Sequence, residues 1–240
     1  WDAATHEIAS FINNNSDLTI LSILSNAAEI SVFTVYRYVT SNIKKVVTNA
    51  TVGFVFAFGD MYARKEYELM EKNLRIFELI TYTLTSIIYS VALVMIVPFV
   101  MLYTSGITDA NYYRPVFAII LVISSAFNCF EIPYKRVVIG VGKFKDTKQY
   151  VIIESAVNIT ISIIGVIFFG IVGLPIGTLC AMIIRTFQFA HFLSKEILPR
   201  SMKHLDLHIT LCFINMASVY YVSTIYMADL SSWFLCVVYA

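Results

Sequence analysis

Two long stretches of this sequence, Leu79 to Thr108 and Ser155 to Ile184, contain no charged residue. A helix needs about 20 apolar residues to cross the hydrocarbon core of a bilayer, and both stretches exceed that length. The composition agrees, since 58% of the residues are hydrophobic, 14% are charged and the mean hydropathy is +0.75. Soluble domains contain about 25% charged residues. We therefore predict an all-α, polytopic transmembrane helix bundle, and a formal net charge of only +1 argues against a nucleic-acid partner.

Hydropathy read outward from these stretches predicts seven spans, near residues 6–26, 31–57, 76–103, 113–139, 149–170, 173–193 and 209–227. Residues 231–240 resemble an eighth span that stops short of the length needed to cross. The chain starts at Trp1 and has no signal-peptide pattern, so we expect both ends to be cut.

Basic residues concentrate in every second connection between the predicted spans. They are Arg64, Lys65, Lys72 and Arg75 in the first, Lys135, Arg136, Lys143, Lys145 and Lys148 in the second, and Lys195, Arg200 and Lys203 in the third. The other connections contain only Arg114. Because Lys and Arg accumulate in cytoplasmic loops, the first span is predicted to start in the cytoplasm. Acid-first pairs such as Glu71 and Arg75 at i, i+4 also predict a short surface helix in the first basic connection.

The second predicted span carries a polar face. On a helical projection, one narrow arc contains Arg37, Ser41, Lys44, Thr48 and Thr51, with Lys45 at its edge. A basic side chain at mid-bilayer costs about 2.5–3.5 kcal/mol on insertion scales, so a hydrated cavity is the favoured location for this face. The alternative is snorkelling, in which long side chains reach the headgroups from near a helix end.

Other spans carry similar polar faces. Those of the first and fourth spans consist of His6, Ser10, Asn13 and Asp17, and of Ser124, Asn128, Glu131 and Lys135. An ion pair between Glu131 and Lys135 is expected from their i, i+4 spacing.

Asp17 and Glu154 have no obvious local partner in the sequence, and Asn158 lies one turn from Glu154. Intramembrane carboxylates are candidate sites for cations, so these three residues are predicted to bind a coupling proton or sodium ion. The alternative is that the acids are structural and hydrogen-bonded. We expect no other cofactor and no metal site, because His204 and His208 have helical ligand spacing but no third ligand nearby.

The stretch "PYKRVVIGVGKFKDTKQYVIIESAVNITISIIGVIFFGIVGLPIGT", from Pro133 to Thr178, resembles the polysaccharide flippases that move lipid-linked oligosaccharides. The resemblance rests on a proline near the end of one span, a Gly-Lys loop before a span with an early acid and asparagine, and a glycine-rich hairpin ending in Gly-Thr. These flippases belong to the multidrug, oligosaccharidyl-lipid and polysaccharide exporter (MOP) superfamily. Residues 139–141 depart from the small residues expected there, which leaves the branch open.

The resemblance implies a two-lobe transporter working by alternating access in the bacterial cytoplasmic membrane. Residues 1–193 would form its second six-helix lobe and residues 194–240 additional, truncated C-terminal helices, with the N-terminal lobe missing. Arg37, Lys44 and Lys45 would bind the pyrophosphate of an undecaprenyl-linked oligosaccharide, the expected partner besides the bilayer.

Two alternatives remain from the sequence. A drug or cation antiporter of the same superfamily is expected to favour acids over bases in its cavity. An integral-membrane glycosyl or acyl transferase would need a catalytic constellation, and the sequence shows no loop carboxylate pair, metal cluster or nucleophile motif. We therefore do not expect an enzyme.

Overall fold

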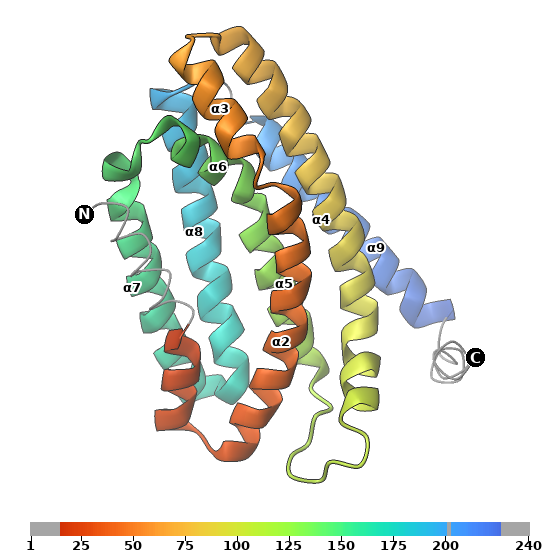
Figure 1. Cartoon of the computed structure of the whole chain (residues 1–240). Coiled ribbons are helices and arrows are strands. Elements are labelled where there is room, and N and C mark those ends of the chain that lie inside the picture. The colour runs from red at the N-terminus through yellow and green to blue at the C-terminus, as the bar shows by residue number, and fades with distance from the viewer. Residues whose placement is uncertain (1–14, 201–202, 227–240) are drawn as a thin grey trace.

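The computed structural model describes residues 15–200 and 203–226, and every regular element in these ranges is helical (Figure 1). After a first helical segment, 15–24, come the elements α2 (Ala27–Ala50), α3 (Phe54–Ala63), α4 (Tyr67–Tyr103), α5 (Pro115–Phe130), α6 (Ile132–Val141), α7 (Phe144–Phe169), η1 (Gly170–Val172), α8 (Gly173–Glu196) and α9 (Lys203–Tyr226). The helices run along one axis of an elongated bundle. The predicted all-α fold is confirmed.

Five helical stretches of the described residues are long and apolar enough to cross a membrane: Ala27–Ala63, Tyr67–Tyr103, Pro115–Val141, Lys145–Glu196 and Leu205–Ile225. The fourth stretch turns back at η1, so that α7 and α8 form a hairpin. These stretches contain almost all of the last six predicted spans. Only the second half of the first predicted span is described, and the truncated span at 231–240 lies outside the described residues.

Two of the predicted spans are interrupted. The span expected at 31–57 is divided between α2 and α3, and the one expected at 113–139 is divided between α5 and α6. The half-helices α3 and α6 pack at one end of the bundle through Gly59 and Gly140 (Figure 1). A Cβ on Gly140 would lie 2.4 Å from the carbonyl oxygen of Val55, so only glycine permits this backbone approach.

The surface helix expected in the first basic connection is not a separate element. Helix α4 begins at Tyr67, and its first turns carry the predicted ion pair between Arg75 and Glu71, with Nη2 and Oε1 2.6 Å apart. Met70 and Leu74 are fully buried and continue the apolar face of the membrane-crossing part of α4. The buried apolar face runs without a break from the first turns of α4 into its membrane-crossing part, which is consistent with one continuous helix from Tyr67 to Tyr103.

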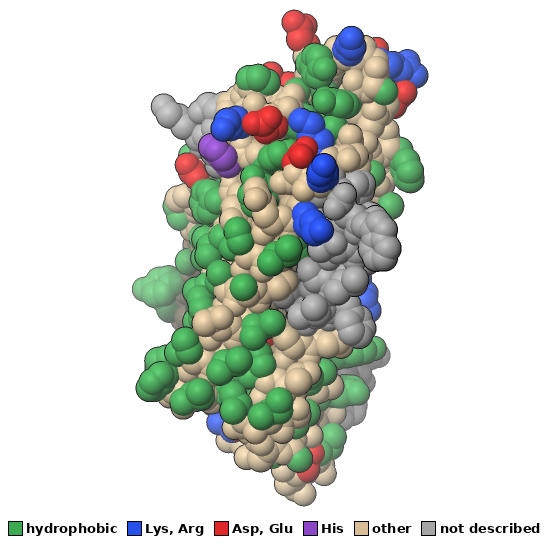
Figure 2. All heavy atoms as spheres, turned by 90° about the vertical axis from the view of Figure 1, so that its left-hand side faces the viewer, with side chains coloured by type: hydrophobic (Ala, Val, Ile, Leu, Met, Phe, Trp, Pro, Cys, Tyr) green, Lys and Arg blue, Asp and Glu red, His purple; other side chains and the backbone are tan. Residues whose placement is uncertain are grey.

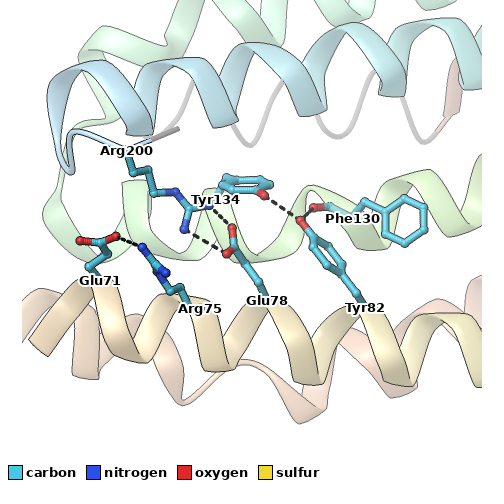
Figure 3. A network of polar contacts seen from close by, with 7 residues as sticks. All are labelled: Glu71, Arg75, Glu78, Tyr82, Phe130, Tyr134 and Arg200. Atoms are coloured by element: carbon cyan, nitrogen blue, oxygen red, sulfur yellow. Dashed lines mark hydrogen bonds and ion pairs between the residues drawn. The ribbon is translucent and has the colours of Figure 1, made fainter. Parts of the chain in front are cut away.

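The C-terminal helix is tied to the bundle through α4. Figure 3 shows Arg200, which follows α8, in a two-point ion pair with the buried Glu78 of α4, where Nη1 lies 3.0 Å from Oε2. Farther along α4, Asn215 of α9 donates hydrogen bonds to Ser86 at 2.8 Å and Ser90 at 3.3 Å.

The predicted division after residue 193 falls inside α8, which continues to Glu196, and the division into two parts stays a prediction.

The basic connections lie at one end of the bundle, as their alternation in the sequence requires. The turns after α3 and α6 and the end of α8 meet at the upper end in Figure 1, while the turn before α2, the loop before α5 and η1 lie at the lower end. Most of the charged side chains on the face in Figure 2 gather near the upper end, and hydrophobic side chains cover the middle. This pattern is typical of a bundle whose middle faces lipid.

The cytoplasmic location of the upper end is a prediction that cysteine labelling tests. A cysteine replacing the exposed Lys145 is expected to react with a membrane-impermeant thiol reagent only from the cytoplasm, and one replacing the exposed Asp109 only from outside. The chain without introduced cysteines serves as the background control, because Cys180 is half-buried whereas Cys129 and Cys212 are buried. Labelling of both positions from the same side would contradict the assignment.

Candidate functional site

A cavity of about 320 Å³ lies among the first helical segment and helices α2, α5, α6, α7 and α8. The charged side chains that line it are Asp17, Arg37, Lys44, Glu131, Lys135, Arg136, Glu154 and Arg185. Five of these eight are basic and three are acidic, so the cavity carries a net positive charge when all are ionised. The fold therefore encloses a polar, cationic cavity within its membrane-crossing helices.

Helix α2 contributes the polar face that the helical projection predicts. Four residues of the predicted arc line the cavity: Arg37, Ser41, Lys44 and Thr48. The Nζ atom of Lys44 donates a hydrogen bond to Oδ1 of Asn128 on α5 at 3.0 Å. The Arg37 guanidinium lies over the Phe33 ring, 5.6 Å from its centroid. Lys44 thus bonds to a neighbouring helix and both bases line the cavity, which favours the cavity over snorkelling.

Lys45 lies apart from this face. Its side chain is exposed, does not line the cavity, and donates to Oδ1 of Asn42 on its own helix at 3.3 Å. One residue rotates a helix by about 100°, which turns Lys45 away from Lys44. Its predicted role in substrate binding stays a prediction, and this cavity does not support it.

The ion pair expected between Glu131 and Lys135 is replaced by a longer-range one. Arg185 of α8 lies between Glu131, at the junction of α5 and α6, and Glu154 of α7. Its Nε is 2.9 Å from Oε1 of Glu131, and its Nη1 bonds Oε2 of Glu154. The guanidinium also lies over the Phe189 ring at 5.6 Å. The Lys135 side chain lines the cavity and makes no hydrogen bond or ion pair with another described residue.

The three residues predicted to bind a coupling ion all line the cavity, but in different environments. Oδ1 of Asp17 is buried and has no hydrogen-bond partner among the described residues. Glu154 has no partner close to it in the sequence, but it forms an ion pair with Arg185 of α8. Oδ1 of Asn158 accepts a hydrogen bond from Oγ of Ser162 at 3.0 Å. Of the two acids in this set, Asp17 thus has one buried oxygen without a hydrogen-bond partner in the described part of the chain, and the ion-binding role of all three stays a prediction.

Arg185 is the residue that the sequence reasoning missed. It interrupts the predicted span 173–193 as its one charged residue, immediately after a charge-free stretch. An ionisable residue inside a span is a functional candidate by default, and that signal was available. Its partners Glu131 and Glu154 could not be predicted from the sequence, because they do not lie on the same helix as Arg185.

No group of three or more His, Cys, Asp or Glu side chains in ranges 15–200 and 203–226 is arranged to hold a metal ion. His208 lies against Tyr82, with ring centroids 5.5 Å apart. The side chain of His204 lies outside the described part.

The fold is similar to that of solved MOP superfamily transporters. One, from Pyrococcus furiosus, is described as having a binding pocket of reverse polarity that suggests a different function; it matches with a TM-score of 0.69 and 15% identity over 90% of this chain. Another, a multidrug resistance MATE family transporter in an outward-facing conformation, matches with a TM-score of 0.66 and 14% identity over 90% of this chain. Each match covers 50% of the solved chain, so this chain spans about half the length of those structures. No protein-family model matches the sequence, and no curated protein matches it. At this identity the likeness establishes the fold alone: a multi-pass membrane helix bundle similar to about half of each of those solved chains.

Proposed function

We propose that the chain forms one half of a transporter that flips an undecaprenyl-pyrophosphate-linked oligosaccharide across the bacterial cytoplasmic membrane by alternating access. The observation that carries the proposal is the excess of basic side chains in a cavity within membrane-crossing helices. A pyrophosphate needs several positive donors in a site of low dielectric constant. Lys44 and Lys135 offer point charges, and Arg37 offers a fork of donors.

The size of the cavity is sufficient for the head of such a lipid. A volume of about 320 Å³ lies at the low end of small-molecule sites, which span about 300–1,000 Å³. In this proposal the pyrophosphate occupies the cavity, and the sugars and the prenyl chain extend beyond it, against the other half of the transporter and the lipid.

A drug or cation antiporter is the second candidate, and one observation favours it. The cavity also contains Asp17, Glu131 and Glu154, and one oxygen of Asp17 has no hydrogen-bond partner among the described residues. An organic cation would be attracted to that oxygen. Against this candidate, Glu131 and Glu154 already share Arg185, which leaves fewer negative charges than the sequence suggests.

Charge reversal at Lys44 tests the flippase proposal. In cells that depend on the full-length protein for surface polysaccharide, Lys44→Glu is expected to reduce export at least about tenfold, because one lost charge-assisted contact is worth roughly 1.5–3 kcal/mol. Lys44→Arg keeps the charge and should retain most export. Export and membrane abundance are measured together.

Two further charge reversals provide the comparison. Lys72→Glu changes an exposed basic residue on α4 that does not line the cavity, and export should be retained. Lys45→Glu tests whether Lys45 also contributes to substrate binding. Because Lys45 points away from the cavity and bonds to Asn42, we expect a smaller loss of export than for Lys44→Glu. Normal polysaccharide export by correctly inserted Lys44→Glu protein would contradict the proposed function. Stronger binding of organic cations by the same variant would favour the antiporter.

A further inference from the structure

A second pocket, of about 700 Å³, lies at the upper end of the α7–α8 hairpin. It is formed by the first turns of α7 and the last turns of α8, and it shares no lining residue with the cavity described above. Three lysines and two carboxylates line it, so the pocket carries a net positive charge. These residues and one histidine are Lys145, Asp146, Lys148, His191, Lys195 and Glu196.

Lys143, the residue before α7, forms one edge of this pocket. Its Nζ atom donates a hydrogen bond to the carbonyl oxygen of Glu196 at 3.1 Å. The same atom lies 5.7 Å from the centroid of the Phe192 ring, which lines the pocket. Lys143 thus connects the start of α7 to the end of α8 and adds a fourth positive charge beside the pocket.

Two of the lysines in the pocket are available to a ligand. Lys145 and Lys195 are exposed and form no ion pair or hydrogen bond with another residue in ranges 15–200 and 203–226. Arg64 and Arg75 near the same end of the bundle differ, because each pairs with an acid one turn before it, at 3.0 and 2.6 Å. The positive charge of the pocket is therefore not neutralised within the described part of the protein.

The face of α7 that forms the pocket becomes apolar toward the lower end of the bundle. Lys145, Lys148 and Ile152 share this face, because residues three and four apart lie on the same side of a helix. The same periodicity continues the face to Ile163 and Ile167, which are 37% and 64% exposed. Basic side chains at the end of the helix are thus followed by apolar side chains that are open to lipid.

Helix α8 repeats this arrangement. His191 and Lys195, one turn apart, line the pocket. Phe187 and Ile184 lie four and seven residues before His191, on the same face, and both are large apolar side chains exposed on the surface. Figure 2, which faces the side of the bundle that α7 occupies, shows charged side chains near the upper end and hydrophobic side chains beneath them. The two helices together offer a basic pocket above an apolar surface.

We infer that this pocket binds the headgroup of an anionic phospholipid. The phosphate lies among Lys145, Lys148 and Lys195, and the acyl chains lie along the exposed apolar faces of α7 and α8. Basic pockets between membrane helices are typical sites for such headgroups. A free phosphate ion makes no use of the apolar faces, and a zwitterionic lipid brings a positive group to a positive pocket. The bound lipid joins the ends of α7 and α8, and this role is independent of the proposed function.

Phosphatidylglycerol is the probe for this site, and phosphatidylcholine is the comparison lipid. Binding to the purified full-length protein in detergent is measured by native mass spectrometry, as the fraction of protein that carries one lipid. One lysine near an anionic lipid contributes a factor of about five in affinity. Lys145→Gln combined with Lys195→Gln is therefore expected to lower the affinity for phosphatidylglycerol at least about tenfold and to leave phosphatidylcholine binding unchanged. Both side chains are exposed, so the variant should fold.

The matched control is Lys65→Gln combined with Lys72→Gln. It removes two charges from exposed lysines near the same end of the bundle but outside the pocket, and it should bind phosphatidylglycerol as the wild type does. An equal loss in this control, unchanged binding by the Lys145 and Lys195 variant, or equal binding of both lipids by the wild type would each overturn the site. If inorganic phosphate displaces phosphatidylglycerol and sodium chloride of the same ionic strength does not, the pocket binds a free anion and the lipid assignment is wrong.

Discussion

Replacing Gly173 by alanine is expected to prevent the α7–α8 hairpin from closing and to leave little folded protein. A Cβ at this position would lie 2.0 Å from the backbone carbon of Gly165 and 2.2 Å from the backbone nitrogen of Val166. Both obstacles are backbone atoms, which cannot rotate aside as a side chain can. Overpacking of a core typically costs about 1–3 kcal/mol, and this contact should exceed that range. The measurement is the yield of monodisperse protein in mild detergent, with its apparent melting temperature.

Gly53→Ala is the control for this substitution. Gly53 connects α2 and α3, has an α-helical φ of −61°, and a Cβ there would meet nothing within 4 Å. The alanine should be neutral, or stabilise the protein by about 0.4–1 kcal/mol by restricting the unfolded chain. If Gly173→Ala melts at the same temperature as Gly53→Ala, α7 and α8 are not in backbone contact at Gly165 and Gly173.

Much of the fold could be predicted from the sequence, because the bilayer imposes simple rules. Charge-free stretches of sufficient length predict the spans. The alternation of basic and non-basic connections predicts the side of the membrane on which each connection lies. The interruption at residues 51–53 was not predicted, because a hydropathy window averages across it. Pro133 was a local signal of the interruption between α5 and α6, since a proline cannot donate the backbone hydrogen bond that a continuous helix requires at its position.

The candidate site could be predicted only within single helices. Helical periodicity correctly grouped Arg37, Ser41, Lys44 and Thr48, since residues three and four apart share a face. It gave Glu131 the wrong partner, because i, i+4 spacing cannot detect a base on another helix. Arg185 reaches Glu154 across 31 residues of sequence, and only the close packing of α7 on α8 brings them together. The glycines that permit this packing are thus also what positions the charges.

Removal of Arg185 has the second large expected effect. Arg185→Met keeps a long, flexible side chain against Phe189 but leaves Glu131 and Glu154 buried without their guanidinium. Removing one partner of a buried ion pair costs about 3–5 kcal/mol, so a large drop in the apparent melting temperature is expected. Arg114→Met breaks an ion pair with Glu29 whose side chains are 38% and 22% exposed, and the cost there should be at most about 1 kcal/mol.

A triple variant separates charge from packing. When Arg185→Met is combined with Glu131→Gln and Glu154→Gln, no uncompensated charge remains in the cluster, and much of the lost stability should return. Buried ion clusters can often be replaced by neutral groups of similar size with little net loss, because the desolvation of the charges is no longer required. If Arg185→Met alone has the same melting temperature as the wild type, the two carboxylates do not depend on the guanidinium, and the stability argument is wrong.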